Sequence, residues 1–173
     1  MPKNPWTRLV TMTFMVTIPI LGLAIVTFFI MFWGLGIDRL GDNTLVIAND
    51  APLPQRRTIG LIAALVPSLL VLQSLWHLFE MFRGIHSGNA LTRKTVKSLR
   101  WFSTYACLAT ISAIALSGVI RWAMGEFDDQ PLWTHLQISP VDLAVLFMAG
   151  VTWAASSAIE DGIAMAREVQ DYV

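Results

Sequence analysis

The sequence predicts an all-α integral membrane protein with four transmembrane helices arranged as two hairpins. The first observation is composition: the 173-residue chain is 55% hydrophobic and 14% charged, whereas soluble domains contain about 25% charged residues. The second is that the apolar residues gather in four long runs, and about 20 such residues suffice to cross a bilayer. The predicted spans cover about residues 9–36, 59–79, 101–120 and 141–159.

The first run, from Leu9 to Gly36, contains no charged residue. It is longer than the apolar core of a signal peptide, so we expect a retained transmembrane helix. Residues 37–58, which follow it, are rich in the Asp, Asn and Pro residues that form turns. Within them, residues 44–48 suit either a short extended segment or an interfacial contact, and the pattern does not decide between the two.

A polar link, residues 80–100, joins the second and third spans. It is expected to break the helix at Gly84 and again near Gly88, and Thr92 is expected to cap the third helix. Basic side chains at a helix N-terminus oppose the helix dipole, so they are better explained by contact with anionic lipid headgroups or a protein partner. The residues predicted to make this contact are Arg93, Lys94, Lys97 and Arg100.

The fourth span has a sequence typical of a helix start, with Ser139 as cap, Pro140 as first helical residue and Asp142 as the acid of a capping box. Its helical apolar pattern continues into residues 160–173, which predicts a C-terminal extension beyond the membrane.

The distribution of basic residues predicts the orientation. Eight of the twelve Lys and Arg residues lie in the N-terminal segment, the link and the C-terminal segment, and four lie in the other two connections. Cytoplasmic segments carry the excess of Lys and Arg. We therefore expect a multi-pass inner-membrane protein with both termini and the link in the cytoplasm.

Small residues at i, i+4 and i+8 predict how two of the spans pack, because they let helix backbones approach closely in lipid. Such residues occur in the third and fourth spans: Ala109, Ala113 and Ser117, then Gly150, Ala154 and Ala158. We expect these two spans to form one hairpin. The same pattern also suits the interface of a homodimer.

Polar residues inside the spans mark the candidate site. Gln73, His77 and Glu80 share one face of the second helix, and Tyr105 and Glu160 lie at a similar depth on the third and fourth. Ionisable residues at such depth are a functional hypothesis by default. Together the five predict a polar pocket for a small molecule or lipid. The alternative is hydrogen bonding between helices, with Glu80 reaching the headgroups.

Several functions are not supported by the sequence. No nucleophile or oxyanion donor stands beside His77 and Glu80, so an enzyme is not expected. Two potential ligands are too few for a zinc site, and a single histidine within the spans cannot hold a haem on both sides; no metal or cofactor is predicted. Zero net charge gives no overall field that would recruit nucleic acid, and direct nucleic-acid binding is not expected.

Three short motifs resemble the DUF2975 family of small bacterial four-span membrane proteins. They are Leu75–Phe79, Gly88–Thr92 and Val96–Arg100, and the charged segment from Glu160 is similar to the family's C-terminal tail. Leu91 departs from the pattern, in which an aromatic residue is usual. The resemblance implies four spans and no assigned activity, and genes of such proteins often lie beside a helix-turn-helix regulator, which suggests sensing or immunity.

The leading functional hypothesis is a non-enzymatic protein that acts through protein partners, as an accessory subunit or as a regulatory or immunity-type component. The partner would be another membrane protein, a cytoplasmic regulator or a second copy of the chain. The alternative is a protein that binds a small molecule or lipid in the polar pocket.

Overall fold

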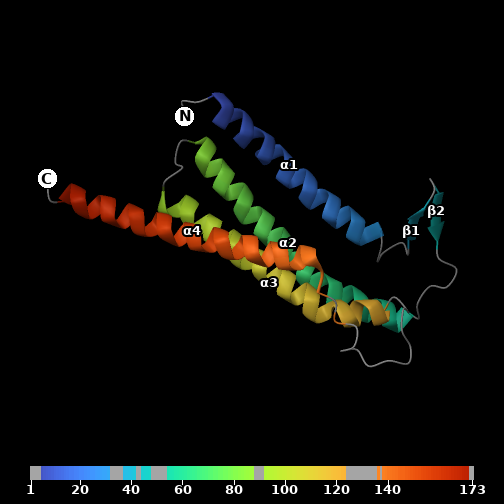
Figure 1. Ribbon diagram of the computed structural model, residues 1–173. Coiled ribbons are helices and arrows are strands. Elements are labelled where there is room, and N and C mark those ends of the chain that lie inside the picture. Colours follow the sequence, from blue (N-terminus) through green and yellow to red (C-terminus); the bar gives the residue numbers. More distant parts are fainter. Residues whose placement is uncertain are drawn as a thin grey trace.

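Four long helices form the protein in the computed structural model, which describes residues 5–31, 37–41, 44–47, 54–87, 92–123, 136 and 138–171. Figure 1 shows them together with a small β-hairpin. All four are long and apolar enough to cross a membrane, which confirms the predicted fold class. The helices are α1 (Pro5–Phe29), α2 (Pro54–His86), α3 (Arg93–Ala123) and α4 (Pro140–Asp171).

The β-hairpin joins β1 (Ile37–Gly41) to β2 (Thr44–Ile47) as an antiparallel pair. Its register pairs Gly41 with Thr44 and Ile37 with Ile47, with an irregularity between Ile37 and Arg39. Residues 44–47 are therefore extended. Their partner is β1, which the sequence pattern did not predict. An irregularity of this kind disturbs the alternation of apolar and polar residues by which a strand is recognised.

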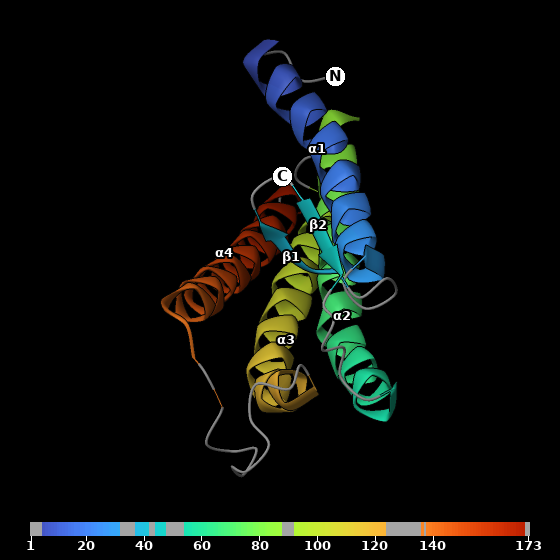
Figure 2. The ribbon, with the colours of Figure 1, turned by 90° about the vertical axis from the view of Figure 1, so that its right-hand side faces the viewer.

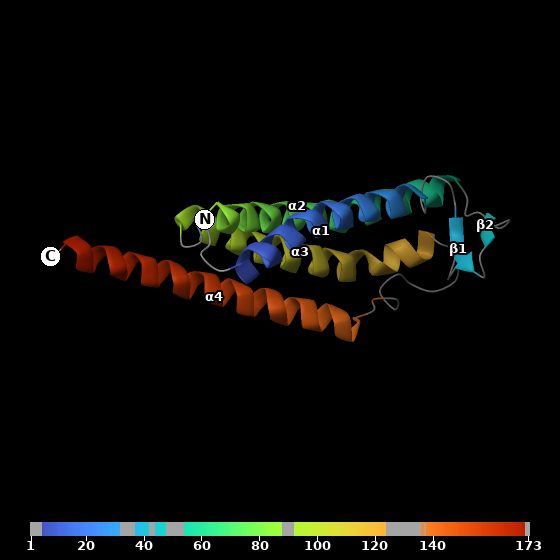
Figure 3. The ribbon, with the colours of Figure 1, turned by 90° about the horizontal axis from the view of Figure 1, so that it is seen from above.

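Each helix packs on its neighbour in the chain. The most extensive contact is between α2 and α3, followed by α3 with α4 and α1 with α2. Both predicted hairpins, α1 with α2 and α3 with α4, are present. The most extensive contact joins α2 of the first hairpin to α3 of the second. Figures 2 and 3 show α1 and α4 on the outside of the α2–α3 pair. An exposed residue in the spans of this bundle consequently faces away from the other described helices.

The two ends of the bundle differ. The start of α1 and the end of α4 lie at the end where α2 connects to α3, which we call the link end; the β-hairpin lies at the opposite end (Figure 1). Figures 1 and 3 also show α4 running past the other helices at the link end.

Thr92 caps α3, as the sequence predicts: the backbone N–H of Thr95 donates to Thr92 Oγ1 at 3.4 Å. The predicted break at Gly84 is wrong, because α2 continues through Gly84 to His86. A Cβ at Gly84 would lie 2.6 Å from Thr95 Oγ1. Glycine at this position serves the close approach of two helices rather than the end of one.

The start of α4 also matches its predicted capping box. The backbone N–H of Ser139 donates to Asp142 Oδ2 at 2.8 Å, and that of Val141 donates to Ser139 Oγ at 3.1 Å. Two free N–H groups at the helix start are thereby satisfied by side chains.

The small-residue stripe of α4 does not face α3, contrary to the prediction. Gly150, Ala154 and Ala158 are exposed, and a Cβ at Gly150 would meet no atom within 4 Å. The face that is buried carries Ala149 and Ser156 instead. Successive residues in a helix are separated by about 100°, so one position along the chain decides whether a small residue faces α3 or lipid.

Candidate functional site

An aromatic cluster joins α2 and α3 in the half of the bundle nearer the link end. His77 of α2 stacks on Tyr105 of α3, with ring centroids 5.4 Å apart and planes 10° apart. Trp101 completes the cluster, with centroids 6.3 Å from His77 and 5.6 Å from Tyr105. The contact between His77 and Tyr105 brings together two of the residues predicted to bind a ligand.

Glu80 stands beside this cluster. Its Oε2 atom lies 3.7 Å from His77 Nδ1, and the two side chains are 35% and 18% exposed. That distance is too long for a hydrogen bond, and His77 Nδ1 is buried without a partner in the described part of the chain. Glu80 and His77 can thus attract each other as an ion pair only when the imidazole is protonated.

Gln73 and Glu160 lie outside this group. Gln73 is exposed on α2, and Glu160 accepts a hydrogen bond from the Arg100 guanidinium across the α3–α4 contact at 3.4 Å. Arg100 and Trp101 are adjacent, so their side chains leave α3 about 100° apart. One reaches α4 and the other α2, which separates Glu160 from His77.

Arg100 connects α3 to α4 rather than standing free at the membrane surface. In addition to its bond with Glu160, its guanidinium carbon lies 4.9 Å from the centroid of the Trp153 ring, a cation–π geometry. The other three basic residues predicted for headgroup or partner contact, Arg93, Lys94 and Lys97, are exposed. The four basic residues therefore divide into one helix-to-helix contact and three exposed positions.

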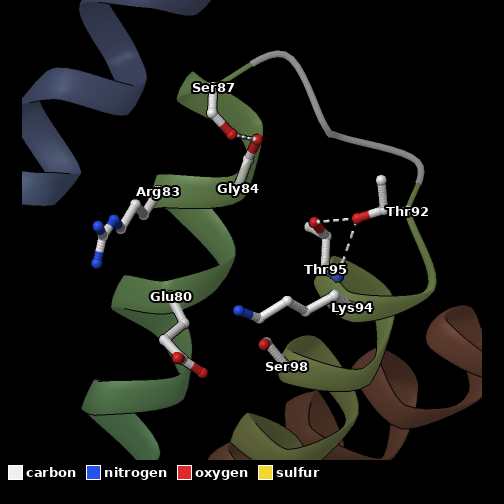
Figure 4. Close-up of a pocket in the computed structure, with 8 residues that line it drawn as sticks. All are labelled: Glu80, Arg83, Gly84, Ser87, Thr92, Lys94, Thr95 and Ser98. Atoms are coloured by element: carbon white, nitrogen blue, oxygen red, sulfur yellow. Dashed lines mark hydrogen bonds between the residues drawn. The ribbon is translucent and has the colours of Figure 1, made fainter.

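A pocket opens between the link-end turns of α2 and α3 (Figure 4). Its volume is about 410 Å³, within the range typical of ligand sites. Only Glu80 and Lys94 among its lining residues belong to the sets predicted from the sequence. The pocket is lined by Glu80, Arg83, Gly84, Ser87, Thr92, Lys94, Thr95 and Ser98.

The pocket lies about one helical turn nearer the link end than the predicted one. Its residues lie within the link, at the end of α2 and the start of α3, and the sequence marks this segment as polar without showing which side chains meet. The sequence also does not show the contact of Ser74, whose hydroxyl donates to the Phe102 carbonyl at 3.1 Å across α2 and α3. Contacts between residues far apart in the chain leave no local pattern from which they could be read.

Comparison with known proteins identifies the family. The family model described as "Protein of unknown function (DUF2975)" matches residues 42–171. The chain belongs to the DUF2975 family. The match begins in the β-hairpin and includes α2, α3 and α4, so the pocket and the aromatic cluster lie inside the family region. No curated protein and no solved structure matches the chain.

The pocket of this DUF2975 protein is lined by ammonium, carboxylate and hydroxyl groups, and the Arg83 guanidinium on its rim is turned away from α3 (Figure 4). In the ranges that the structure describes, no three His, Cys, Asp or Glu residues are placed to hold a metal ion together.

We expect Arg100→Ala to lower the free energy of unfolding of this DUF2975 protein by about 1–2 kcal/mol, because it removes both the pair with Glu160 and the stacking on Trp153. Glu160→Gln should cost less than about 1 kcal/mol, since both partners of that pair are half exposed. Unfolding by sodium dodecyl sulfate in mixed micelles measures both. Arg93→Ala, at an exposed position on the same helix, is the control, and equal losses for the two arginine variants would contradict the assignment.

Proposed function

We propose that this DUF2975 protein is a non-enzymatic inner-membrane protein that acts by binding a second membrane protein through α4. The observation that supports this is the open small-residue face of α4: Gly150, Ala154 and Ala158 are exposed. In lipid, helices associate by close van der Waals contact, which small residues permit. We expect a transmembrane helix of the partner to pack on this face.

The remainder of α4 supports the same proposal. Its opposite face, with Ala149 and Ser156, is already covered, while a Cβ at Gly150 or at Gly162 would meet nothing within 4 Å. The open face thus runs along about three turns of the helix. Beyond the other helices, α4 continues at the link end (Figure 3), where a partner could meet it outside the membrane.

The proposed orientation places the link end in the cytoplasm. The excess of Lys and Arg in the segments at this end supports it. Arg93 and Lys97 are exposed there, and each would gain about 1 kcal/mol from anionic headgroups near the surface. The absence of a nucleophile beside His77 and Glu80 in the sequence is the reason for proposing a binding role over catalysis.

The test is a double variant, Gly150→Leu with Ala154→Leu, in a tagged chain purified from native membranes in mild detergent. We expect the partner's recovery to fall at least about tenfold, because leucine at these positions keeps the two backbones apart. The fold itself should be retained, since a Cβ at Gly150 meets no atom within 4 Å in the part of the chain that the structure describes.

Ala155→Leu is the matched control, because Ala155 is also exposed but lies about 100° around the helix from Ala154. It should leave the recovery unchanged. Equal recovery with the double variant would contradict the proposal. If the recovered protein is only a second, differently tagged copy of the chain, the occupant of this face is a homodimer and the proposed partner protein is wrong.

A further inference from the structure

We propose that the pocket between the link-end turns of α2 and α3 binds a phosphodiester group, as carried by a glycerophospholipid headgroup or by a soluble phosphate ester. This inference concerns a different part of the molecule from the open face of α4 and does not depend on the proposed partner. It is based on three features of the pocket: a hydroxyl on its wall without a hydrogen-bond partner among the described residues, the balance of charge, and the depth in the bilayer.

The hydroxyl is that of Ser98, which lies on the pocket wall and is only 6% exposed. Figure 4 shows its hydroxyl directed into the space between α2 and α3, and no hydrogen bond to Ser98 is found in the described part of the chain. A ligand oxygen in the pocket would accept a hydrogen bond from this hydroxyl.

Charge around the pocket favours an anion with a single negative charge. Lys94 extends from α3 toward α2, and Arg83 lies on the rim with its guanidinium turned away from α3 (Figure 4). Glu80 is the carboxylate among the lining residues. The lining side chains thus carry one net positive charge, with Lys94 as the cation that reaches into the pocket, and a phosphodiester would neutralise that charge. The N-terminus of α3 adds partial positive charge on the same side.

The depth of the pocket is that of the headgroup layer. The apolar segments that could cross the membrane are 29 residues long in α2 and 31 in α3, or about 43 and 46 Å at 1.5 Å per residue. The hydrocarbon core is about 30 Å thick, and about 40–45 Å with the headgroups. The ends of both helices therefore reach the level at which lipid phosphates lie.

Native mass spectrometry of the full-length protein in dodecyl maltoside tests the inference, with phosphatidylglycerol as the lipid probe. Lys94→Gln should weaken phosphatidylglycerol binding about tenfold or more, which corresponds to loss of one charge-assisted hydrogen bond. Ser98→Ala should weaken it several-fold without lowering stability, because its hydroxyl has no partner to lose among the described residues. Lys97→Gln is the matched control: Lys97 is exposed on the same helix but does not line the pocket.

Two further probes distinguish the source of the phosphate. Monogalactosyldiacylglycerol, which has similar acyl chains and no phosphate, should bind without dependence on Lys94. If soluble glycerophosphoglycerol binds with the same dependence on Lys94 and phosphatidylglycerol does not, the site takes a soluble ester and its phosphodiester chemistry is upheld. Equal weakening by Lys94→Gln and Lys97→Gln, or no binding of either phosphate compound to the wild type, would overturn the proposal.

Discussion

Replacing Gly84 with alanine is expected to lower the free energy of unfolding by about 1–3 kcal/mol, the usual cost of forcing extra volume into a packed site. The added Cβ would lie 2.6 Å from Thr95 Oγ1. Thr95 is buried, and its hydroxyl is hydrogen-bonded to that of Thr92 at 3.0 Å. Thr95 has two χ1 rotamers open to it in a helix, but a change of rotamer would break its hydrogen bond with Thr92.

Unfolding in mixed micelles measures this effect, and a second substitution tests its cause. With Thr95→Ala, the nearest remaining atom of residue 95 would be its Cβ, at 3.7 Å, so Gly84→Ala should cost much less in that background. Gly162→Ala is the matched control, because a Cβ there meets no atom within 4 Å. It should be neutral or stabilise by up to about 1 kcal/mol, since alanine favours a helix more than glycine does. A cost for Gly84→Ala that is unchanged by Thr95→Ala would show that the contact with Thr95 is not its origin.

The second large effect is expected for Ser156→Leu. Ser156 is fully buried, at 0% exposed, and its hydroxyl donates to the Trp153 carbonyl of its own helix at 2.7 Å. Its hydroxyl therefore does not bond to α3, and what matters for the packing of α4 on α3 is the small volume of the serine side chain. Leucine should cost about 1–3 kcal/mol by overpacking. Because α3 is the one helix on which α4 packs extensively, the strain is most easily relieved by moving α4 outward, which also separates Arg100 from Glu160.

Hydrogen exchange of peptides from α4 measures that movement. We expect faster exchange along α4 in Ser156→Leu and unchanged exchange in α2, which makes its main contact with α3 on another side. Ala155→Leu, one residue earlier and exposed, should change stability by less than about 0.5 kcal/mol. If both leucine variants behave alike, the predicted packing of α4 on α3 through Ser156 is wrong.

Features set by neighbours in the chain were predictable from the sequence. The four spans follow from runs of apolar residues, because every exposed residue of a span must tolerate lipid. The caps at Thr92 and Ser139 follow because the groups that they satisfy lie two to three residues away in the chain. The resemblance to the DUF2975 family rests on motifs of five residues, and the family model confirms it over residues 42–171. In the candidate site, the proximity of His77 to Glu80 was predictable because residues three apart lie on the same face of a helix.

The tertiary structure decided which side of each helix meets another helix. In water, the apolar side of a helix faces the interior, so its periodicity shows the buried face. In lipid, both sides are apolar, and that indication is lost. The sequence therefore placed Gly150 and Ala154 against α3, where the structure places Ala149 and Ser156. For the same reason, the number of spans was determined by the sequence alone, whereas the pocket between α2 and α3 appeared only once the helices were packed.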